Sequence, residues 1–289
     1  PGAGMDVARD AMAFARLGIG ALCIGAMKRC AQLMLRYASR REVAGGRLLD
    51  HPVTLARLDA LTCAIAALEA LVQALAAHDE RGAGLPQEAC MACKCVASEL
   101  LWESADALMQ LLGGRGYLEP NLAPLLLRDA RVMRILEGPT EALYVHLGSG
   151  ALDGGCLDFV AGVLDAPALA QQARAALRGP GAACSAYAAG ELCAWTLLAA
   201  AVPEGSPEGA AAAGWARRRW SALLAQLGQD GARAPVETLA GRIAAYAEAI
   251  GAPDQEAAGE GRERDPLLEP EWPRAAEGVP AQRVASAAP

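Results

Sequence analysis

The chain has few aromatic side chains, few histidines and no long uninterrupted hydrophobic run. Aromatic residues are 4% of its 289 positions, and there are 3 His. The longest charge-free apolar runs, such as Leu17–Met27 and Leu192–Val202, are far shorter than the roughly 20 residues that a bilayer-spanning helix needs. The net charge of -7, without an extended basic face, argues against binding to nucleic acid. We therefore expect no membrane span and no nucleic-acid partner.

The 9 cysteines could indicate disulfides or a metal site, but they are scattered through helical pattern, which favours reduced thiols. Cys90, Cys93 and Cys95 form C-x-x-C-x-C inside such a pattern with no second cluster nearby. Buried thiols are therefore favoured over zinc, and we expect no metal. Because the chain begins with Pro1, we expect its natural start to be missing or processed; with no secretory signal visible, we expect a cytoplasmic protein, an organellar matrix being the alternative.

Alanine and leucine dominate the sequence in periodic blocks that glycine and proline separate, which favours helix almost everywhere. β-Branched residues are scarce and no convincing strand is visible. Residues spaced by three and four give the second predicted helix one apolar stripe: Leu61, Ile65, Leu68, Leu71 and Leu75. Four helices are predicted in the first half, at Asp6–Arg41, Val53–His78, Pro86–Leu112 and Pro139–Gly148. The fold class is all-α, with these four helices packed as an up-down bundle.

The second half continues the helical pattern without motifs that carry chemistry. Four shorter helices are predicted there, at Asp158–Leu177, Ala182–Val202, Ala210–Leu227 and Val236–Ile250. Beyond them Pro, Glu, Gly and Arg accumulate without apolar period, which is typical of disorder. The predicted domains are the bundle at 1–152, a second helical domain at 153–252 and a disordered tail at 253–289.

Glu137 is the carboxylate whose surroundings stand out. It lies between Ile135-Leu136 and Gly138-Pro139, neighbours that would desolvate it, and desolvation suits a general base that works near neutral pH. On the local sequence alone, an acid at the start of a helix, stabilised by the helix dipole, is the favoured interpretation.

The stretch Gln110–Leu143 reads QLLGGRGYLEPNLAPLLLRDARVMRILEGPTEAL. It resembles the C-terminal helical domain of flavin-dependent acyl-CoA dehydrogenases, whose recurring pattern is "Q-x-x-GG-x-GY…RD-x-R…EG-T". The resemblance covers about residues 6 to 150 and includes the run from FARLGIG to GRLLDHPV, which is similar to the family's first helix of this domain. The resemblance favours a general base at Glu137 over a carboxylate that only stabilises the start of a helix.

The resemblance implies a role for each matching residue. Glu137 would remove the α-proton of an acyl thioester while the β-hydrogen leaves as hydride to FAD; some relatives carry the base before an Arg of the first helix, a position that is Ala15 here. Arg16 would lie near the acyl-CoA. The residues implied to bind FAD, across a subunit interface, are Arg41, Gln110, Gly113 and Gly114. Arg128 and Asp129 match a pair that is mainly structural.

Two departures and two hints concern the sub-family. Ala44 replaces an aromatic residue, and Pro139 separates Gly138 from Thr140. The "EGPTE" wording resembles the branch beside acyl-carrier-protein modules of lipopeptide assembly lines. The extra helices resemble the layout of the very-long-chain branch.

The sequence thus predicts a fragment of an FAD-dependent acyl-CoA or acyl-carrier-protein dehydrogenase, catalytically poor by itself because the family's N-terminal and middle domains are not in it. The resemblance implies an electron-transfer flavoprotein or similar acceptor and a homodimer or homotetramer. The alternatives are a non-catalytic helical dimerisation module, which Ala44 and Pro139 favour, and an acyl-CoA oxidase.

Overall fold

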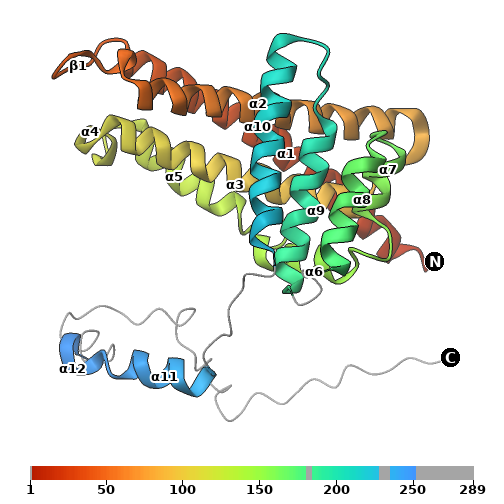
Figure 1. Ribbon diagram of the computed structural model, residues 1–289. Helices are drawn as coiled ribbons and strands as arrows, with labels where there is room; N and C mark the ends of the chain where they lie inside the picture. Colours follow the sequence, from red (N-terminus) through yellow and green to blue (C-terminus); the bar gives the residue numbers. More distant parts are fainter. Residues whose placement is uncertain (1, 180–183, 228–234, 252–289) are drawn as a thin grey trace. The chain divides into compact units, whose positions relative to one another are not determined.

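The computed structural model describes residues 2–179, 184–227 and 235–251, and regular structure in these ranges is almost entirely helical (Figure 1). The chain divides into two compact units, residues 1–231 and residues 232–289. The prediction of an all-α fold is confirmed.

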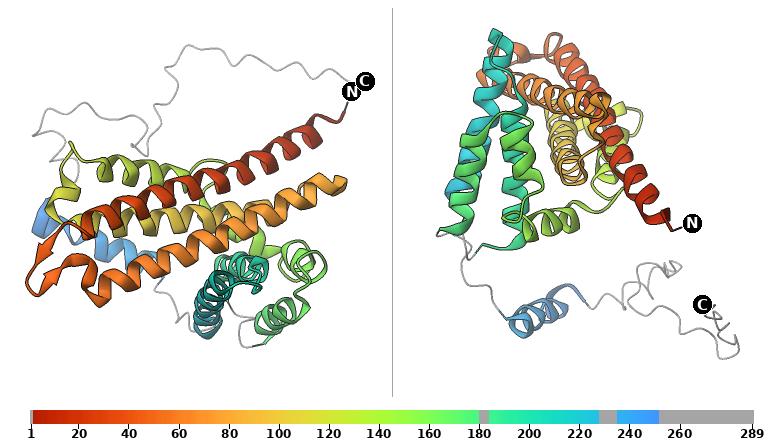
Figure 2. Two further views of the ribbon diagram at one scale, coloured as in Figure 1. Left: turned by 90° about the horizontal axis from the view of Figure 1, so that it is seen from above. Right: turned by 90° about the vertical axis from the view of Figure 1, so that its right-hand side faces the viewer.

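Four helices form an up-down bundle in the first unit: α1 (Gly4–Ala38), α2 (Pro52–His78), α3 (Gln87–Leu112) and α5 (Leu122–Met133). Figure 2 (left) shows these helices running lengthwise beside one another. Three of them match the prediction closely, but the fourth does not. We expected the segment 139–148 in that place; it forms a separate helix, α6 (Thr140–Ser149), which packs mainly against α9. Residues 122–133 were not predicted as a helix, although the side chain of Asn121 caps it by accepting from the amide of Ala123.

Local chemistry sets the connections of the bundle. Between α1 and α2, β1 (Glu42–Val43) and β2 (Gly46–Arg47) pair antiparallel as a two-residue hairpin, where no strand was predicted. The hairpin turns at Gly45 and Gly46, whose φ values of 95° and 128° are open to glycine. A 3-10 turn, η1 (Leu48–Asp50), then leads to Pro52 at the start of α2. The π-helical turn η2 (Asp79–Ala83) closes α2, and α4 (Gly114–Tyr117) links α3 to α5.

The core lies between the bundle helices, and the stripe predicted on α2 faces it. Leu68, Leu71 and Leu75 are fully buried. The middle of α3 is buried nearly all round, because α1, α2, α5 and α9 all pack on it. This position makes α3 the axis of the unit.

The second half begins with α7 (Cys156–Gly162), α8 (Pro167–Arg178), α9 (Ala186–Ala201) and α10 (Pro207–Gln226). The segment Asp158–Leu177 was predicted as one helix; it is two, because the backbone turns left-handed at Asp165 (φ 51°) and α8 starts at Pro167. α9 packs on α3 and α6, and α10 on α2, and Figure 2 (left) shows this group almost end-on, across the direction of the bundle. Arg219 of α10 donates to both carboxylate oxygens of Glu103 on α3, at 3.0 and 2.6 Å.

Helices on both sides of residue 152 thus belong to the same compact unit, and a domain boundary at that residue stays a prediction. The second unit contributes α11 (Val236–Ala244) and α12 (Ala247–Ile250), where one continuous helix was predicted. The predicted disordered tail, 253–289, lies outside the described residues.

Two helices, 4–38 and 52–83, are long and apolar enough to cross a membrane by length and composition. Core helices of a soluble protein pass the same test, and both helices pack against other helices of the bundle, although only 33% and 44% of their apolar windows are buried. The absence of a membrane span stays a prediction.

Glycines hold α6 and α9 in close contact. A Cβ added to Gly190 would overlap the backbone carbonyl of Tyr144, and one added to Gly148 would overlap the carbonyl of Ala186. Because residue 144 faces 190 while residue 148 faces 186, the two helices run antiparallel here. Neither backbone can move aside as a flexible side chain could, so the contact requires glycine at both positions.

We expect Gly190→Ala to lower the free energy of unfolding by about 1–3 kcal/mol, the usual cost of overpacking. Gly25→Ala is the matched control, because its Cβ would meet nothing within 4 Å on the exposed side of α1. The control should be neutral or stabilising, since alanine is the better helix former by about 1 kcal/mol. Urea unfolding of both variants measures the difference; equal stabilities would contradict the glycine contact.

Candidate functional site

Glu137 lies in the tight turn between α5 and α6, and its backbone is left-handed. Its φ is 55°, in a region that non-glycine residues rarely adopt, and Gly138 follows with a φ of 103°. A left-handed residue that is not glycine costs roughly 1–2 kcal/mol. Such a conformation persists only where its surroundings enforce it.

Two buried cations bind the backbone of this turn. Arg16 of α1, whose exposed fraction is 6%, donates from Nε to the carbonyl of Glu137 at 3.2 Å. Lys94 of α3, which is fully buried, donates from Nζ to the carbonyl of Gly138 at 2.8 Å. Hydrogen bonds from charged groups contribute roughly 1.5–3 kcal/mol each, so the pair outweighs the cost of the left-handed residue.

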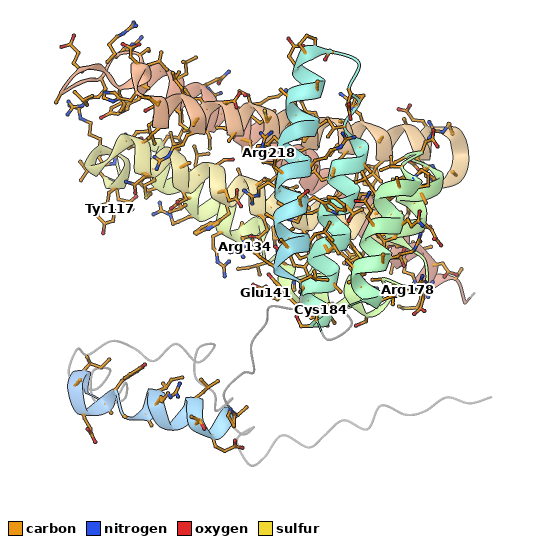
Figure 3. The ribbon with its side chains drawn as sticks, viewed as in Figure 1. Tyr117, Arg134, Glu141, Arg178, Cys184 and Arg218 are labelled. Carbon is orange, nitrogen blue, oxygen red and sulfur yellow. The ribbon has the colours of Figure 1, made fainter. Side chains whose placement is uncertain are left out.

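A third attachment closes the turn on itself. The amide of Thr140 donates to the carbonyl of Arg134 at 3.0 Å, and the Arg134 side chain pairs with Glu99 of α3 at 2.6 Å. Figure 3 labels Arg134 and Glu141, which lie on either side of the turn. The turn is therefore tied to α1 and α3 while the side chain of Glu137 stays half-buried. Ile135 and Leu136 are 51% and 45% exposed, so within the described residues they do not enclose the carboxylate as the sequence suggested.

Burial controls the electrostatics around Lys94. Desolvation lowers the pKa of its ammonium, while neighbouring groups, Cys95 first among them, oppose the shift. Burial also raises the pKa of the Cys23 and Cys95 thiols to about 12, so both are neutral at pH 7. The described residues contain no ion pair to Lys94 within 4 Å, and the Gly138 carbonyl is its recorded hydrogen-bond partner.

Arg41 lies at the other end of α1, beside a cavity of about 500 Å³. Its backbone is held from both sides, since its amide donates to the carbonyl of Tyr37 at 3.0 Å and its carbonyl accepts from Leu48 at 2.7 Å. Four arginines, one glutamate and four uncharged residues line the cavity: Arg36, Arg40, Arg41, Arg115, Glu42, Tyr37, Asn121, Leu33 and Leu112. Guanidinium groups suit phosphate oxygens because each can donate two parallel hydrogen bonds.

Gln110, Gly113 and Gly114 lie next to this cavity at the end of α3. The amide of Gly113 donates to the carbonyl of Gln110 at 3.2 Å, and Gly113 adopts a φ of 58° as the helix ends. Gln110 is exposed on the last turn of α3. Of the predicted flavin residues, Arg41 lines the cavity, whereas Gln110, Gly113 and Gly114 adjoin its lining residues Leu112 and Arg115 in the chain.

The two sets of predicted residues are far apart within one chain. Arg16 and Ala38 are separated by roughly 33 Å along α1 at 1.5 Å per residue, and Arg41 lies just beyond. The structure thus brings Arg16 to Glu137 and places Arg41 in a cavity that Leu112 and Arg115, close to Gln110 in the chain, also line, but it does not bring these two places together.

Sequence reasoning missed Lys94 and three of the cavity arginines: Arg36, Arg40 and Arg115. The signal for Lys94 was a lysine between thiols in an otherwise apolar stretch of helix. The C-x-x-C-x-C pattern was interpreted through its cysteines, and the lysine between Cys93 and Cys95 was therefore not considered. Cys90, Cys93 and Cys95 are buried in α3, and the described residues contain no group of three potential ligands that could hold a metal ion.

Comparisons with known proteins show which family this chain is similar to. The family model for the C-terminal domain of acyl-CoA dehydrogenases matches residues 2–151. The very long-chain specific acyl-CoA dehydrogenase of Mus musculus is 28% identical over 157 residues, 54% of this chain and 23% of that protein. The acryloyl-CoA reductase (NADH) of Anaerotignum propionicum is 29% identical over 140 residues, 48% of this chain and 35% of the relative.

Among solved structures, an acyl-CoA dehydrogenase complexed with FAD from Bacillus anthracis is similar with a TM-score of 0.59 at 14% identity. The likeness covers 84% of this chain and 53% of that one, so the fold extends beyond the residues of the family model. At this identity it shows the fold alone. The chain spans less than two thirds of each of these relatives.

Proposed function

Because the chain belongs to the acyl-CoA dehydrogenase family, we propose that it forms the C-terminal part of a flavin-dependent enzyme that desaturates an acyl thioester at the α,β bond. The observation that carries the proposal is the turn at Glu137, a carboxylate on a left-handed backbone that two buried cations hold. In this proposal Glu137 takes the α-proton of the substrate. The thioester is an acyl-CoA or an acyl-carrier protein.

The cavity at Arg41 fits part of the FAD molecule. Its arginines supply donors for a diphosphate, and Gly113 and Gly114 allow a close approach of backbone beside it. Bound flavin would supply the acceptor for the hydride that leaves the β-carbon. Charge from these arginines supports binding; Ala44 offers no aromatic face, and Tyr37 is the aromatic side chain in the lining.

The distance along α1 bears on assembly. Since Arg41 lies more than roughly 33 Å along α1 from Arg16, which binds the turn at Glu137, we propose that Arg41 and Glu137 serve different flavins, with Arg41 and Gln110 reaching the flavin of a second subunit in a homodimer or homotetramer. The exposed apolar side chains of Leu122, Leu125 and Val132 on α5 are surface that such an assembly or the upstream domains would cover. An electron-transfer flavoprotein or a similar protein would reoxidise the flavin.

A flavin-binding measurement tests the proposal on a longer chain that carries the family's N-terminal and middle domains ahead of Pro1. We expect bound FAD, bleached by a saturated acyl-CoA or acyl-carrier protein. Arg41→Glu should weaken FAD binding about 10- to 100-fold, because it removes a charged hydrogen-bond donor. Arg29→Glu is the control, an equal change of charge on an exposed part of α1 outside the cavity.

Three outcomes separate the alternatives. A colourless protein after reconstitution favours the non-catalytic dimerisation module. Rapid reoxidation of the reduced flavin by oxygen identifies an acyl-CoA oxidase instead. Equal FAD affinity of Arg41→Glu and Arg29→Glu removes Arg41 from the flavin site.

A further inference from the structure

Lys94 is a buried cation for which the reaction just proposed has no direct use. It is fully buried about two turns from the start of α3, where an apolar side chain would avoid the cost of removing a charge from water. Its recorded hydrogen bond goes from Nζ to the carbonyl of Gly138, 44 residues further along the chain. A lysine that is buried under these conditions needs a reason beyond packing.

Stabilisation of α6 is not that reason. Gly138 lies just before the N-terminus of α6, the positive end of the helix dipole, where a cation is unfavourable. Pairing with an acid is not the reason either, because the carboxylate of Glu99, the acid of α3 nearest in sequence, is bound to Arg134. What remains is the carbonyl itself, and with it the conformation of the turn.

The geometry of the turn suits a clamp, by which we mean the hydrogen bond from Lys94 to the carbonyl of Gly138 holding the backbone of the turn. Gly138 follows Glu137 with a second positive φ, and its carbonyl accepts from Lys94 of α3. Arg16 binds the preceding carbonyl from α1. Two consecutive carbonyls are thus bound from two helices, which leaves the backbone at Glu137 little freedom to rotate.

We infer that Lys94 is a positioning residue, which holds Gly138 and thereby keeps Glu137 in its left-handed conformation. The inference rests on the proposed function for the catalytic use of Glu137. The clamp itself is a property of this chain and can be measured without flavin or substrate.

Hydrogen exchange on the 289-residue chain measures the clamp. In Lys94→Met, a change that keeps the apolar stem of the side chain and removes the ammonium group, the amide of Thr140, which donates to the carbonyl of Arg134 across the turn, should exchange about 10- to 100-fold faster, as expected for losing a hydrogen bond to a charged group. Amides of α2 should be unchanged, because removing a buried charge also removes its desolvation cost. Ser98→Ala is the matched control, since the buried Ser98 hydroxyl donates only within α3, to the carbonyl of Cys95.

Unchanged exchange of the Thr140 amide in Lys94→Met overturns the inference, and so does a loss of protection spread evenly over the unit, which marks a merely structural role. If the variant does not fold, NMR of the unchanged protein decides: a scalar coupling between Lys94 Nζ and the Gly138 carbonyl carbon supports the clamp. Freely exchanging ammonium protons refute it.

Kinetics of the longer, flavin-loaded protein then separate the clamp from the reaction. Lys94→Met should lower kcat about 10-fold or more with little change in KM, and Ser98→Ala should change neither. If Lys94→Met loosens the turn but the unchanged protein shows no activity, the clamp is supported and the proposed function is refuted. If the unchanged protein is active and Lys94→Met has the same kcat, the positioning role of Lys94 is refuted and the proposed function is supported.

Discussion

Replacing Glu137 by glutamine is expected to lower turnover of the flavin-loaded protein by about 10²–10⁴-fold, the usual contribution of a general base. Glutamine keeps the shape of the side chain and the backbone bonds to Arg16 and Lys94, but it cannot accept the α-proton. No substitute is in reach on α1, because the family's alternative position is Ala15. FAD binding should be unaffected, since the cavity at Arg41 lies at the other end of the bundle.

Stopped-flow bleaching of the flavin by an acyl thioester measures this effect on the chemical step alone. Glu141→Gln is the matched control, an exposed acid one helical turn further along, in the first turn of α6. Turnover by Glu137→Gln within a few-fold of the control would place the base on another residue. A loss of bound flavin in Glu137→Gln would point to a structural role instead.

The second large effect is loss of stability in alkali. Burial raises the pKa of several thiols from the ordinary value of 9.0: to about 11 for Cys30 and to about 12 for Cys23, Cys90, Cys95 and Cys193. Below pH 9 these thiols are protonated in both states and their contribution is fully present. Above pH 9 only the unfolded chain releases the protons, so stability falls as pH rises toward the folded-state values.

Each such thiol lowers the free energy of unfolding by about 1.4 kcal/mol per pH unit in that window. Together the five thiols lower the free energy of unfolding by more than about 5 kcal/mol at pH 10. This loss is comparable with the whole stability of an ordinary domain, about 5–15 kcal/mol. The lowered pKa of Lys94 acts in the opposite direction, because its unfolded form binds the extra proton, but it is a single group. We therefore expect cooperative unfolding near pH 10.

Urea unfolding between pH 8 and pH 10.5, with a reductant present, checks this expectation. Cys193→Ala should reduce the slope of stability against pH by about 1.4 kcal/mol per unit, while stability below pH 9 should fall only by the lost packing. A stability that is level from pH 8 to pH 10.5 would show that the thiols are open to solvent.

Helix boundaries could be predicted from the sequence where nearby residues alone set them. α1, α2 and α3 begin and end within a few residues of the prediction, because glycine and proline interrupt a steady run of alanine and leucine. The predictions went wrong where a boundary depends on one backbone angle. Asp165 and Pro167 break what was predicted as a continuous helix, although Asp is enriched at positive φ and proline marks a helix boundary.

The candidate site was readable in part. The EGPTE motif identified Glu137, and the resemblance identified Arg41 and Gln110 as neighbours of one ligand; their roles stay predictions. Lys94 could not be assigned, since the pattern shows only an unusual lysine in an apolar helix, and its partner is a carbonyl distant in sequence.

The sequence by itself determined the all-α class, the long bundle helices and the family, because helix propensity, capping residues and local motifs act over short spans of chain. Only the tertiary structure decided that α5 completes the bundle, that α6 pairs with α9, and that Arg16 and Lys94 meet at consecutive carbonyls. These depend on which backbones can approach one another, as at Gly148 and Gly190, and on where a buried charge finds an acceptor. Both are properties of segments far apart in the chain, which no local pattern encodes.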